Sequence, residues 1–214
     1  GLKTLLVDEN SYLGGSTIYQ NSEHFKIMNQ TSSSWLEKEI NEIKKLENLE
    51  IKTRTSVAAY HGYNFLLARE NLTDHLPLNQ RKNKTRQRLL KIRAKKVITA
   101  TGSLERPLIF DNNDRPGILL SSALNKYANL FGVACGEKNV LFTNNDSAYE
   151  TAIDYFKQGI NVQAIIDVRV DANGYFPKKA RELGITILNG YEITNTFGRL
   201  RVKEVQLKKL LDNK

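Results

Sequence analysis

The sequence predicts an α/β protein, and three observations carry that prediction. Short apolar stretches of strand length alternate with stretches in which apolar residues recur every three or four positions. Residues 139–167 read as strand, turn, helix and strand, which is a complete βαβ unit. Two apolar strands end in an acid, namely residues 5–7 in Asp8 and residues 162–166 in Asp167.

The first half of the chain is expected to hold one long helix among short strands. A buried strand at residues 5–7 closes on Asp8 and Glu9 and leads to a turn at 13–16. Hydroxyls at residues 31–34 cap a helix whose apolar residues are Trp35, Leu36, Ile40, Ile43, Leu46 and Leu49. Further strands are expected at 51–57, 63–69, 90–95 and 97–102, with a loop at 70–85.

The second half is expected to form a domain of its own. Two proline turns, Glu105-Arg106-Pro107 and Asp114-Arg115-Pro116-Gly117, indicate a connector, and we place the boundary there, giving domains 1–112 and 113–214. Ser121 or Ser122 then caps a helix that runs through Leu130. The βαβ unit is followed by a helix at 176–183, a strand at 185–188, and a hairpin of residues 191–196 and 200–207.

The net charge is +9 over 214 residues, and much of it lies between Arg81 and Lys96, where no acid occurs. Within this run apolar residues alternate with cations, and a period of two indicates a strand with one solvated face. The apolar set is Leu90, Ile92 and Ala94, and the cations are Lys91, Arg93 and Lys95. A solvated strand face is therefore favoured, and an acidic partner subunit or nonspecific attraction to nucleic acid are the alternatives.

Several functional classes are excluded by composition. A single cysteine, Cys135, cannot form an internal disulfide, which favours a reducing, cytoplasmic compartment. There is no apolar run of about 18 residues, and the first residues lack the pattern of a signal peptide. His24, His61 and His75 lie far apart without metal-site or hydrolase spacing, so any redox chemistry would need a bound cofactor.

The acids that end the two strands indicate dinucleotide binding. In residues 1–8 and 159–167 a glycine precedes an apolar strand that ends in an acid. In a dinucleotide-binding βαβ unit this acid accepts hydrogen bonds from the adenosine ribose, and a glycine-rich phosphate loop lies about 20 residues before it. For Asp8 or Glu9 that position precedes residue 1, so we expect the chain to begin inside its first nucleotide fold.

The loop of the second βαβ unit departs from the phosphate-binding pattern. The spacing G-x-G-x-x-G/A places Thr143, Asn145 and Ala148 at the three special positions, and only Ala148 fits. We interpret this as a structural unit whose helix is capped by Asp146 or Ser147, with a functional second dinucleotide site as the alternative.

Four segments of the chain together resemble a known family. They are Val97-Ile98-Thr99-Ala100-Thr101-Gly102, Glu105-Arg106-Pro107, Asp114-Arg115-Pro116-Gly117 and Phe142-Thr143-Asn144-Asn145-Asp146-Ser147-Ala148-Tyr149. In these segments the chain resembles the α subunit of heterotetrameric sarcosine oxidase, and the likeness covers nearly the whole chain. It implies a Rossmann-like two-dinucleotide-binding-domain fold, incomplete at the N-terminus and lacking the C-terminal folate domain. Residues 1–112 would be a partial first domain with a β-rich insertion, and residues 113–214 a second, NAD(P)-binding-like βαβ domain.

The resemblance also implies an activity and its site. The family's enzyme demethylates sarcosine oxidatively to glycine, using oxygen and with tetrahydrofolate as co-substrate, and yields H2O2 and methylenetetrahydrofolate. NAD would bind in this subunit, FAD and FMN elsewhere in the complex, and the partners would be the β, γ and δ subunits. Asp8 or Glu9 would hold the ribose, and no catalytic residue is assigned to this chain. The remaining candidate cofactor-binding residues are Gly14, Gly15, Ser16, Thr101 and Gly102.

Two alternatives stay open at this point. The chain is also compatible with a homologous subunit of another flavin-dependent amine oxidase, of the opine oxidase or hydrogen cyanide synthase type. A protein of a different class, a non-catalytic scaffold whose nucleotide site has decayed, is favoured by Asn145 at a glycine position.

Overall fold

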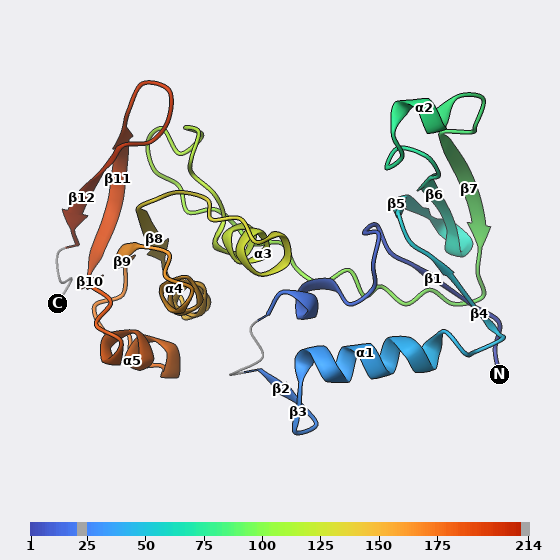
Figure 1. The fold of residues 1–214 in the computed structure, drawn as a ribbon, viewed down its shortest axis with the longest axis horizontal. Helices are drawn as coiled ribbons and strands as arrows, with labels where there is room; N and C mark the ends of the chain where they lie inside the picture. The colour runs from blue at the N-terminus through green and yellow to red at the C-terminus, as the bar shows by residue number, and fades with distance from the viewer. Residues whose placement is uncertain (21–24, 211–214) are drawn as a thin grey trace. The chain divides into compact units, whose positions relative to one another are not determined.

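The computed structural model describes residues 1–20 and 25–210, which form two compact units (Figure 1). Unit 1 comprises residues 1–18 and 25–102, and unit 2 comprises residues 19–20 and 103–210. The units divide after Gly102, where the expected connector begins, while the domain limits 1–112 and 113–214 stay a prediction. His24 lies outside the described residues.

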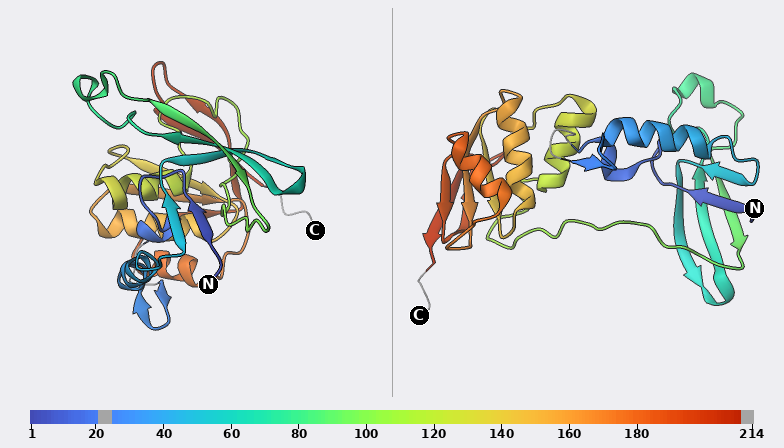
Figure 2. Two further views of the ribbon diagram at one scale, coloured as in Figure 1. Left: turned by 90° about the vertical axis from the view of Figure 1, so that its right-hand side faces the viewer. Right: turned by 90° about the horizontal axis from the view of Figure 1, so that it is seen from below.

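A two-stranded parallel sheet opens unit 1. β1 (Thr4–Val7) pairs with β4 (Leu49–Lys52), and Thr4 lies opposite Leu49. Between them come the 3-10 helix η1 (Gly15–Ile18), the short pair β2 (Lys26–Ile27) and β3 (Gln30–Thr31), and helix α1 (Ser32–Ile43). Figure 2 shows α1 beside η1.

Helix α1 begins as expected and ends early. The Thr31 hydroxyl accepts a hydrogen bond from the N–H of Ser34 at 3.3 Å, which caps the helix. The helix ends at Ile43, so the prediction that it includes Leu46 and Leu49 is wrong: Leu46 is half-exposed in a turn and Leu49 starts β4. Spacing could not find this end, because residues 43, 46 and 49 keep the helical period while Leu49 is taken by pairing with β1.

An antiparallel sheet completes unit 1, with strand order β5-β6-β7 (Figure 2). Its strands are β5 (Thr55–His61), β6 (Phe65–Asn71) and β7 (Gln87–Arg93), with η2 (Gly62–Asn64) and α2 (Leu78–Arg81) in the connections. The expected strand 51–57 is wrong as one element, because the chain turns at Arg54, whose φ is +52°, and its parts join different sheets. The alternation in the basic run is confirmed: Leu90 and Ile92 are half-buried, whereas Lys91 and Arg93 are exposed.

The strand expected at residues 97–102 is not formed. The whole stretch 96–110 has no helix or strand, and Ile98 is 91% exposed. A β-strand persists only where its backbone groups pair with a neighbouring strand, and this segment has no such neighbour among the described residues. The apolar composition therefore indicated strand propensity and could not supply the partner.

Unit 2 is built on a parallel three-stranded sheet of order β10-β9-β8. The βαβ prediction is confirmed as β8 (Asn139–Thr143), α4 (Ser147–Lys157) and β9 (Val162–Asp167). The further helices and third strand are α3 (Ser121–Phe131), α5 (Tyr175–Glu182) and β10 (Ile187–Asn189). Ile185, expected in the strand 185–188, is instead a buried residue before β10.

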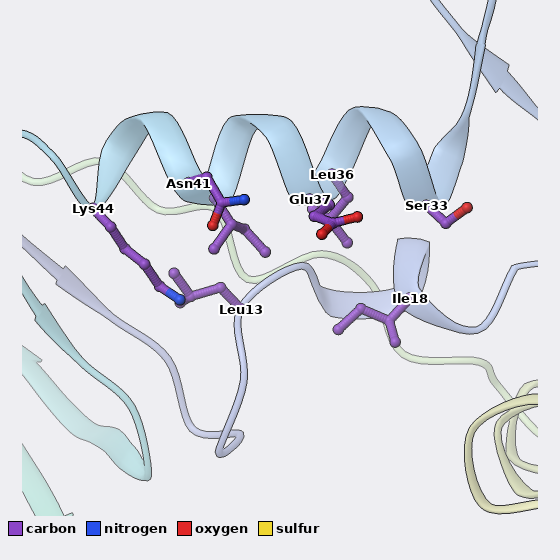
Figure 3. A pocket seen from close by; sticks show the side chains of 8 residues that line it. Leu13, Ile18, Ser33, Leu36, Glu37, Asn41 and Lys44 are labelled. Atoms are coloured by element: carbon purple, nitrogen blue, oxygen red, sulfur yellow. The ribbon is translucent and has the colours of Figure 1, made fainter.

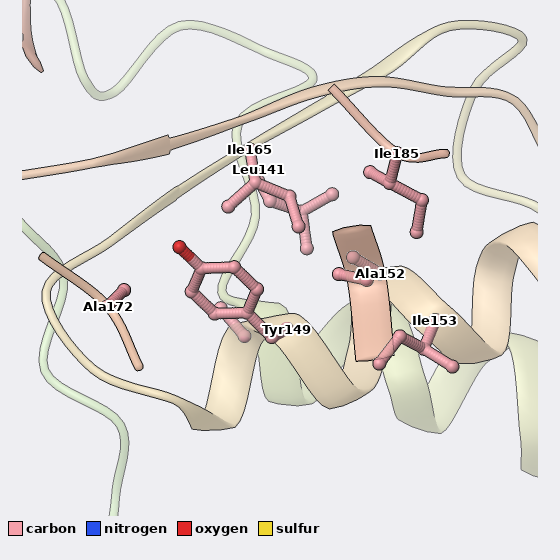
Figure 4. Close-up of a cluster of buried hydrophobic side chains, with 9 residues drawn as sticks. Leu141, Tyr149, Ala152, Ile153, Ile165, Ala172 and Ile185 are labelled. Atoms are coloured by element: carbon pink, nitrogen blue, oxygen red, sulfur yellow. The ribbon is translucent and has the colours of Figure 1, made fainter. Parts of the chain in front are cut away.

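The core of unit 2 lies between α4 and this sheet (Figure 4). Tyr149 and Ala152 of α4 are fully buried, as is Ile165 of the central strand, and Leu141 of β8 is 4% exposed. Their burial holds α4 across the sheet, since removing apolar surface from water contributes about 25 cal/mol per Å². The start of α4 is thereby fixed beside the C-terminal ends of β8 and β9.

The closing hairpin turns later than expected. β11 (Tyr191–Phe197) pairs antiparallel with β12 (Glu204–Lys209). The connection spans 198–203 rather than 197–199, and the N–H of Lys203 donates to the carbonyl of Phe197 at 2.8 Å. Leu200, expected in the second strand, is 81% exposed in this connection.

Helix α3 is capped by a different residue from those expected. Neither Ser121 nor Ser122 is the N-cap, which is Leu120. The carboxylate of Glu105 instead accepts the backbone N–H of Ser121 at 3.1 Å and of Ser122 at 2.7 Å. Burial alone would raise the pKa of Glu105, but hydrogen bonds from the side chains and backbones of Ser122 and Ser121 outweigh it and place the pKa below its ordinary value.

Candidate functional site

The acid at the end of β1 is held rigidly through its backbone. The N–H of Asp8 donates to the carbonyl of Lys52 at 2.9 Å, and its own carbonyl accepts from Thr55 at 2.9 Å. The adjoining loop is fixed as well, because the N–H of Arg54 donates to the carbonyl of Asn10 at 2.7 Å. Asp8 thus occupies a defined position at the C-terminal edge of the parallel pair β1–β4.

Among the described residues, only one oxygen of the Asp8 carboxylate accepts hydrogen bonds. Its Oδ1 accepts the backbone N–H of Asn10 at 2.8 Å and the Asn10 side-chain amide at 3.0 Å. Its Oδ2 accepts no hydrogen bond from the described part of the chain, and the residue is half-buried. Because a carboxylate oxygen is an acceptor only, the open Oδ2 is suited to a hydroxyl or amine donor.

No cation within residues 1–20 and 25–210 neutralises Asp8. Lys52, the cation of β4, directs its ammonium to Glu70 at 3.2 Å and Glu50 at 3.3 Å. Chiefly the hydrogen bond to Glu70 raises the pKa of Lys52. The charge of Asp8 is therefore available for a ligand.

The other candidate residues near Asp8 are distributed along the next loop. Glu9 and Ser16 are exposed, and Gly15 begins η1 with φ +55° and open space where a Cβ would stand. Gly14 has a packing role instead, since a Cβ there would lie 2.5 Å from Leu36 of α1. The loop thus approaches α1 closely at Gly14 and leaves Gly15 and Ser16 accessible.

A groove of about 340 Å³ lies between this loop and α1 (Figure 3). Leu13 and Ile18 line it on the loop side, and Leu36 and Glu37 on the helix side. A second groove of about 280 Å³ lies beside Tyr12 and Thr53. Neither groove is lined by Asp8 or Glu9, so the grooves reflect loop–helix packing and not the position of the acid.

Thr101 and Gly102 are not brought to Asp8 by a paired strand. Both are exposed in the stretch without helix or strand described above, and Gly102 has φ +70° with open space around its Cβ position. Sequence reasoning also missed Asn10, the residue that orients the Asp8 carboxylate. The spacing Asp-x-Asn was the available signal, because such a pair forms a local side-chain turn.

Unit 2 carries the corresponding acid, Asp167, in a different state. Asp167 is fully buried, and its carboxylate is bound by Arg169 Nη2 at 2.7 Å and by the Tyr149 hydroxyl at 2.7 Å. Burial alone would raise the pKa of Asp167, but these donors outweigh it and the pKa lies below its ordinary value. The described residues hold no group of three or more His, Cys, Asp or Glu that could bind a metal ion.

Solved structures of oxidoreductases share this fold. Over 97% of its length the chain superposes on a thioredoxin reductase of T. acidophilum, with TM-score 0.62, 16% identity and 63% of that chain covered. It also superposes on the L-proline dehydrogenase of P. horikoshii, with TM-score 0.60 and 21% identity, covering 96% of this chain and 35% of that one. The fold is thus the Rossmann-like α/β fold of flavin- and pyridine-nucleotide-dependent oxidoreductases.

Sequence comparison then identifies the particular relatives. The chain is 34% identical over 196 residues to the sarcosine oxidase subunit alpha of Corynebacterium sp. (strain P-1), covering 92% of this chain and 20% of the relative. It is 33% identical over 188 residues to that of Rhizobium meliloti (strain 1021), covering 85% and 18%. The resemblance to the sarcosine oxidase α subunit is therefore confirmed, and the chain spans about a fifth of the length of these relatives. No protein-family model matches the chain.

No helix among residues 1–20 and 25–210 is long and apolar enough to cross a bilayer.

Proposed function

We propose that this chain supplies an NAD-binding and assembly module of a sarcosine oxidase α subunit. The observation that carries the proposal is the Asp8 carboxylate, which ends a parallel strand with one oxygen fixed by Asn10 and the other open. An acid in this position accepts hydrogen bonds from the ribose hydroxyls of an adenine dinucleotide. Glu9, exposed beside it, is the second candidate for the same role.

The residues present fit one end of the cofactor. Asp8 suits the adenosine ribose, and Gly15 and Ser16 leave the adjoining loop open, whereas Gly14 faces α1. The pattern G-x-G-x-x-G occurs nowhere in the 214 residues, so the chain does not itself offer the usual pyrophosphate cradle. We therefore expect the 214-residue chain to bind NAD weakly. NAD, when bound, carries hydride, and the role of the chain is to hold its adenosine end.

The reaction of the whole protein is proposed from its relatives. Oxidative demethylation of sarcosine to glycine, with oxygen as the oxidant, tetrahydrofolate as co-substrate and H2O2 and methylenetetrahydrofolate as products, would use FAD and FMN in a complex with β, γ and δ subunits. None of the described residues is assigned to bond breaking. Thr101 and Gly102, exposed in this structure, would pass near the nucleotide.

Calorimetric titration with NAD tests the ribose assignment. Asp8→Ala should weaken NAD binding about 10-fold or more, since a hydrogen bond to a charged group contributes about 1.5–3 kcal/mol. Glu9→Ala tests the second candidate, and Glu47→Ala, an exposed acid in the turn after α1, is the control. Unchanged affinity in both the Asp8 and Glu9 variants would reject the site.

A second titration distinguishes the scaffold alternative. If the assembled complex that contains this chain also fails to bind NAD, the chain acts in assembly alone. Sarcosine, an opine and glycine, offered in turn to the assembled complex, would separate the three amine-oxidising alternatives by the substrate that is consumed.

A further inference from the structure

Asp8 of unit 1 and Asp167 of unit 2 make the same local hydrogen bond to the backbone. Asp8 Oδ1 accepts the backbone N–H of Asn10, two residues on, at 2.8 Å. Asp167 Oδ1 accepts the backbone N–H of Arg169, also two residues on, at 2.9 Å. The two sites then diverge through the side chain at that second position, which is a neutral amide in unit 1 and a guanidinium in unit 2.

In unit 2 a guanidinium binds the carboxylate that ends β9. Arg169 Nε lies 3.1 Å from Asp167 Oδ1 and Nη2 lies 2.7 Å from Oδ2, so the pair is bidentate. The Tyr149 hydroxyl donates to Oδ2 as well. With Asp167 fully buried and both oxygens engaged, a ribose hydroxyl could bind only by displacing a charged partner.

The same guanidinium reaches the loop that precedes α4. Arg169 Nη1 donates to Asp146 Oδ1 at 2.8 Å, so one arginine joins the acid of β9 to the loop after β8. The expectation that Asp146 or Ser147 caps α4 is confirmed in position, because Asp146 is the N-cap residue, but its side chain makes no capping hydrogen bond. Asp146 also packs against the backbone of Gly174, the residue that precedes α5, where a Cβ would collide with its carboxylate.

A backbone N–H at the start of α4, where a phosphate would bind, is also hydrogen-bonded to a side chain. Asn145 Oδ1 accepts the backbone N–H of Ser147 at 3.0 Å and the Ser147 hydroxyl at 2.7 Å. The N–H groups at a helix N-terminus are the donors that a bound phosphate would use. Asn145 stands at the second glycine position of the fingerprint, so its side chain both obstructs the backbone and satisfies the donor.

We propose that unit 2 keeps the form of a dinucleotide-binding βαβ unit but closes its ligand positions with Arg169, Asp146 and Asn145, and so takes no adenine dinucleotide. Arg169 and Asp146, together with Asp167, form an internal latch that ties the C-terminal ends of β8 and β9 to the start of α5. The inference concerns unit 2 alone and does not require the NAD site proposed for unit 1.

Hydrogen exchange read by mass spectrometry on the full chain tests the closure. With saturating NAD, and separately NADP, exchange at residues 143–149 and 167–174 should stay unchanged. Saturable protection there that Asp167→Asn abolishes would overturn the inference. Protection confined to residues 8–16 supports both proposals, and its loss in Asn10→Arg would show that an arginine two residues after the acid closes such a site. If neither region is protected, the unit 1 proposal fails and the closure of unit 2 stands.

Urea unfolding tests the latch without a nucleotide. Gly174 has φ −63°, so an alanine there is strained only by the collision with Asp146. Gly174→Ala should lower the unfolding midpoint, and this effect should largely vanish when Asp146→Ala is already present. An equal loss in both backgrounds would overturn the latch. Arg169→Ala should lower the midpoint more than Arg199→Ala, a matched change at an exposed arginine of the same unit.

Discussion

Single residues decide whether the acids at the ends of β1 and β9 are free to bind a ligand. The open oxygen of Asp8 depends on Asn10, and the closure around Asp167 depends on Arg169. Both pairs lie two positions apart in the sequence, so the spacing was readable. The consequence was not readable, because it depends on whether the carboxylate is half-buried, as in Asp8, or fully buried, as in Asp167.

Gly14 gives a prediction at the same scale. Its φ is +116°, and a Cβ would lie 2.5 Å from Leu36 and 3.0 Å from Ile18. Gly14→Ala should therefore destabilise the protein by about 2 kcal/mol or more, from backbone strain and overpacking together. Gly15→Ala is the control, since its Cβ would meet nothing within 4 Å, and it should cost less. Equal free energies of unfolding for the two variants would contradict this assignment.

Tyr149 offers a test of the buried hydrogen bond in unit 2. Its hydroxyl donates to Asp167 at 2.7 Å, and both residues are fully buried. Burial first, and then the bond to the carboxylate, raise the pKa of Tyr149, so it stays protonated as the donor. Tyr149→Phe should lower the free energy of unfolding by about 1–3 kcal/mol, measured by urea denaturation. A neutral effect would mean that the bond is not formed in solution.

The pH dependence of Asp167 has a definite sign. Its pKa in the folded state lies below its ordinary value, so its stabilising contribution is fully present above pH about 4 and is lost as the pH falls through the folded pKa. The gap in unfolding free energy between wild type and Asp167→Asn should be largest near neutral pH and shrink below pH about 4. A gap independent of pH would refute the ionised state of Asp167.

At the scale of elements, a residue distant in the sequence binds the first backbone N–H groups of α3. Glu105, from the connector, binds the N–H groups of Ser121 and Ser122, and Glu105→Ala should cost about 1 kcal/mol, as for loss of an N-cap. Because its pKa is lowered in the fold, this loss should diminish below pH about 4.5. Glu137→Ala, at an exposed acid of the same unit, is the control, and thermal unfolding is the measurement.

Elements also show how far the sequence could be read. Periodicity found α1, the β8-α4-β9 unit and the basic strand β7, because each carries its pattern locally. Periodicity failed at residues 97–102, which have the composition of a strand but no neighbouring strand among the described residues. It also failed at residues 51–57, where a turn at Arg54 separates strands of two different sheets. Pairing is a property of two segments, so one segment cannot report it.

At the scale of the whole molecule, the charge of +9 is largely a feature of β7 and its loop. Exposed cations such as Lys91 and Arg93 attract polyanions without base recognition. We expect two unrelated DNA duplexes to bind equally and weakly, with most of the affinity lost between about 50 and 200 mM salt. Fluorescence anisotropy would measure this, and a preference for one duplex that persists at the higher salt would revive a nucleic-acid role.

The sequence by itself determined the α/β class, the acids at two strand ends, the departure of residues 143–148 from a phosphate loop, and the family resemblance that comparison confirmed. Only the tertiary structure decided that one oxygen of Asp8 has no partner among the described residues, whereas both oxygens of Asp167 are hydrogen-bonded. The reason is physical: a residue's type and spacing are local, whereas burial and the partners of a carboxylate depend on segments that meet only when the chain has folded. Arg169 illustrates this, because it bridges Asp167 to Asp146, which lies in the loop before α4.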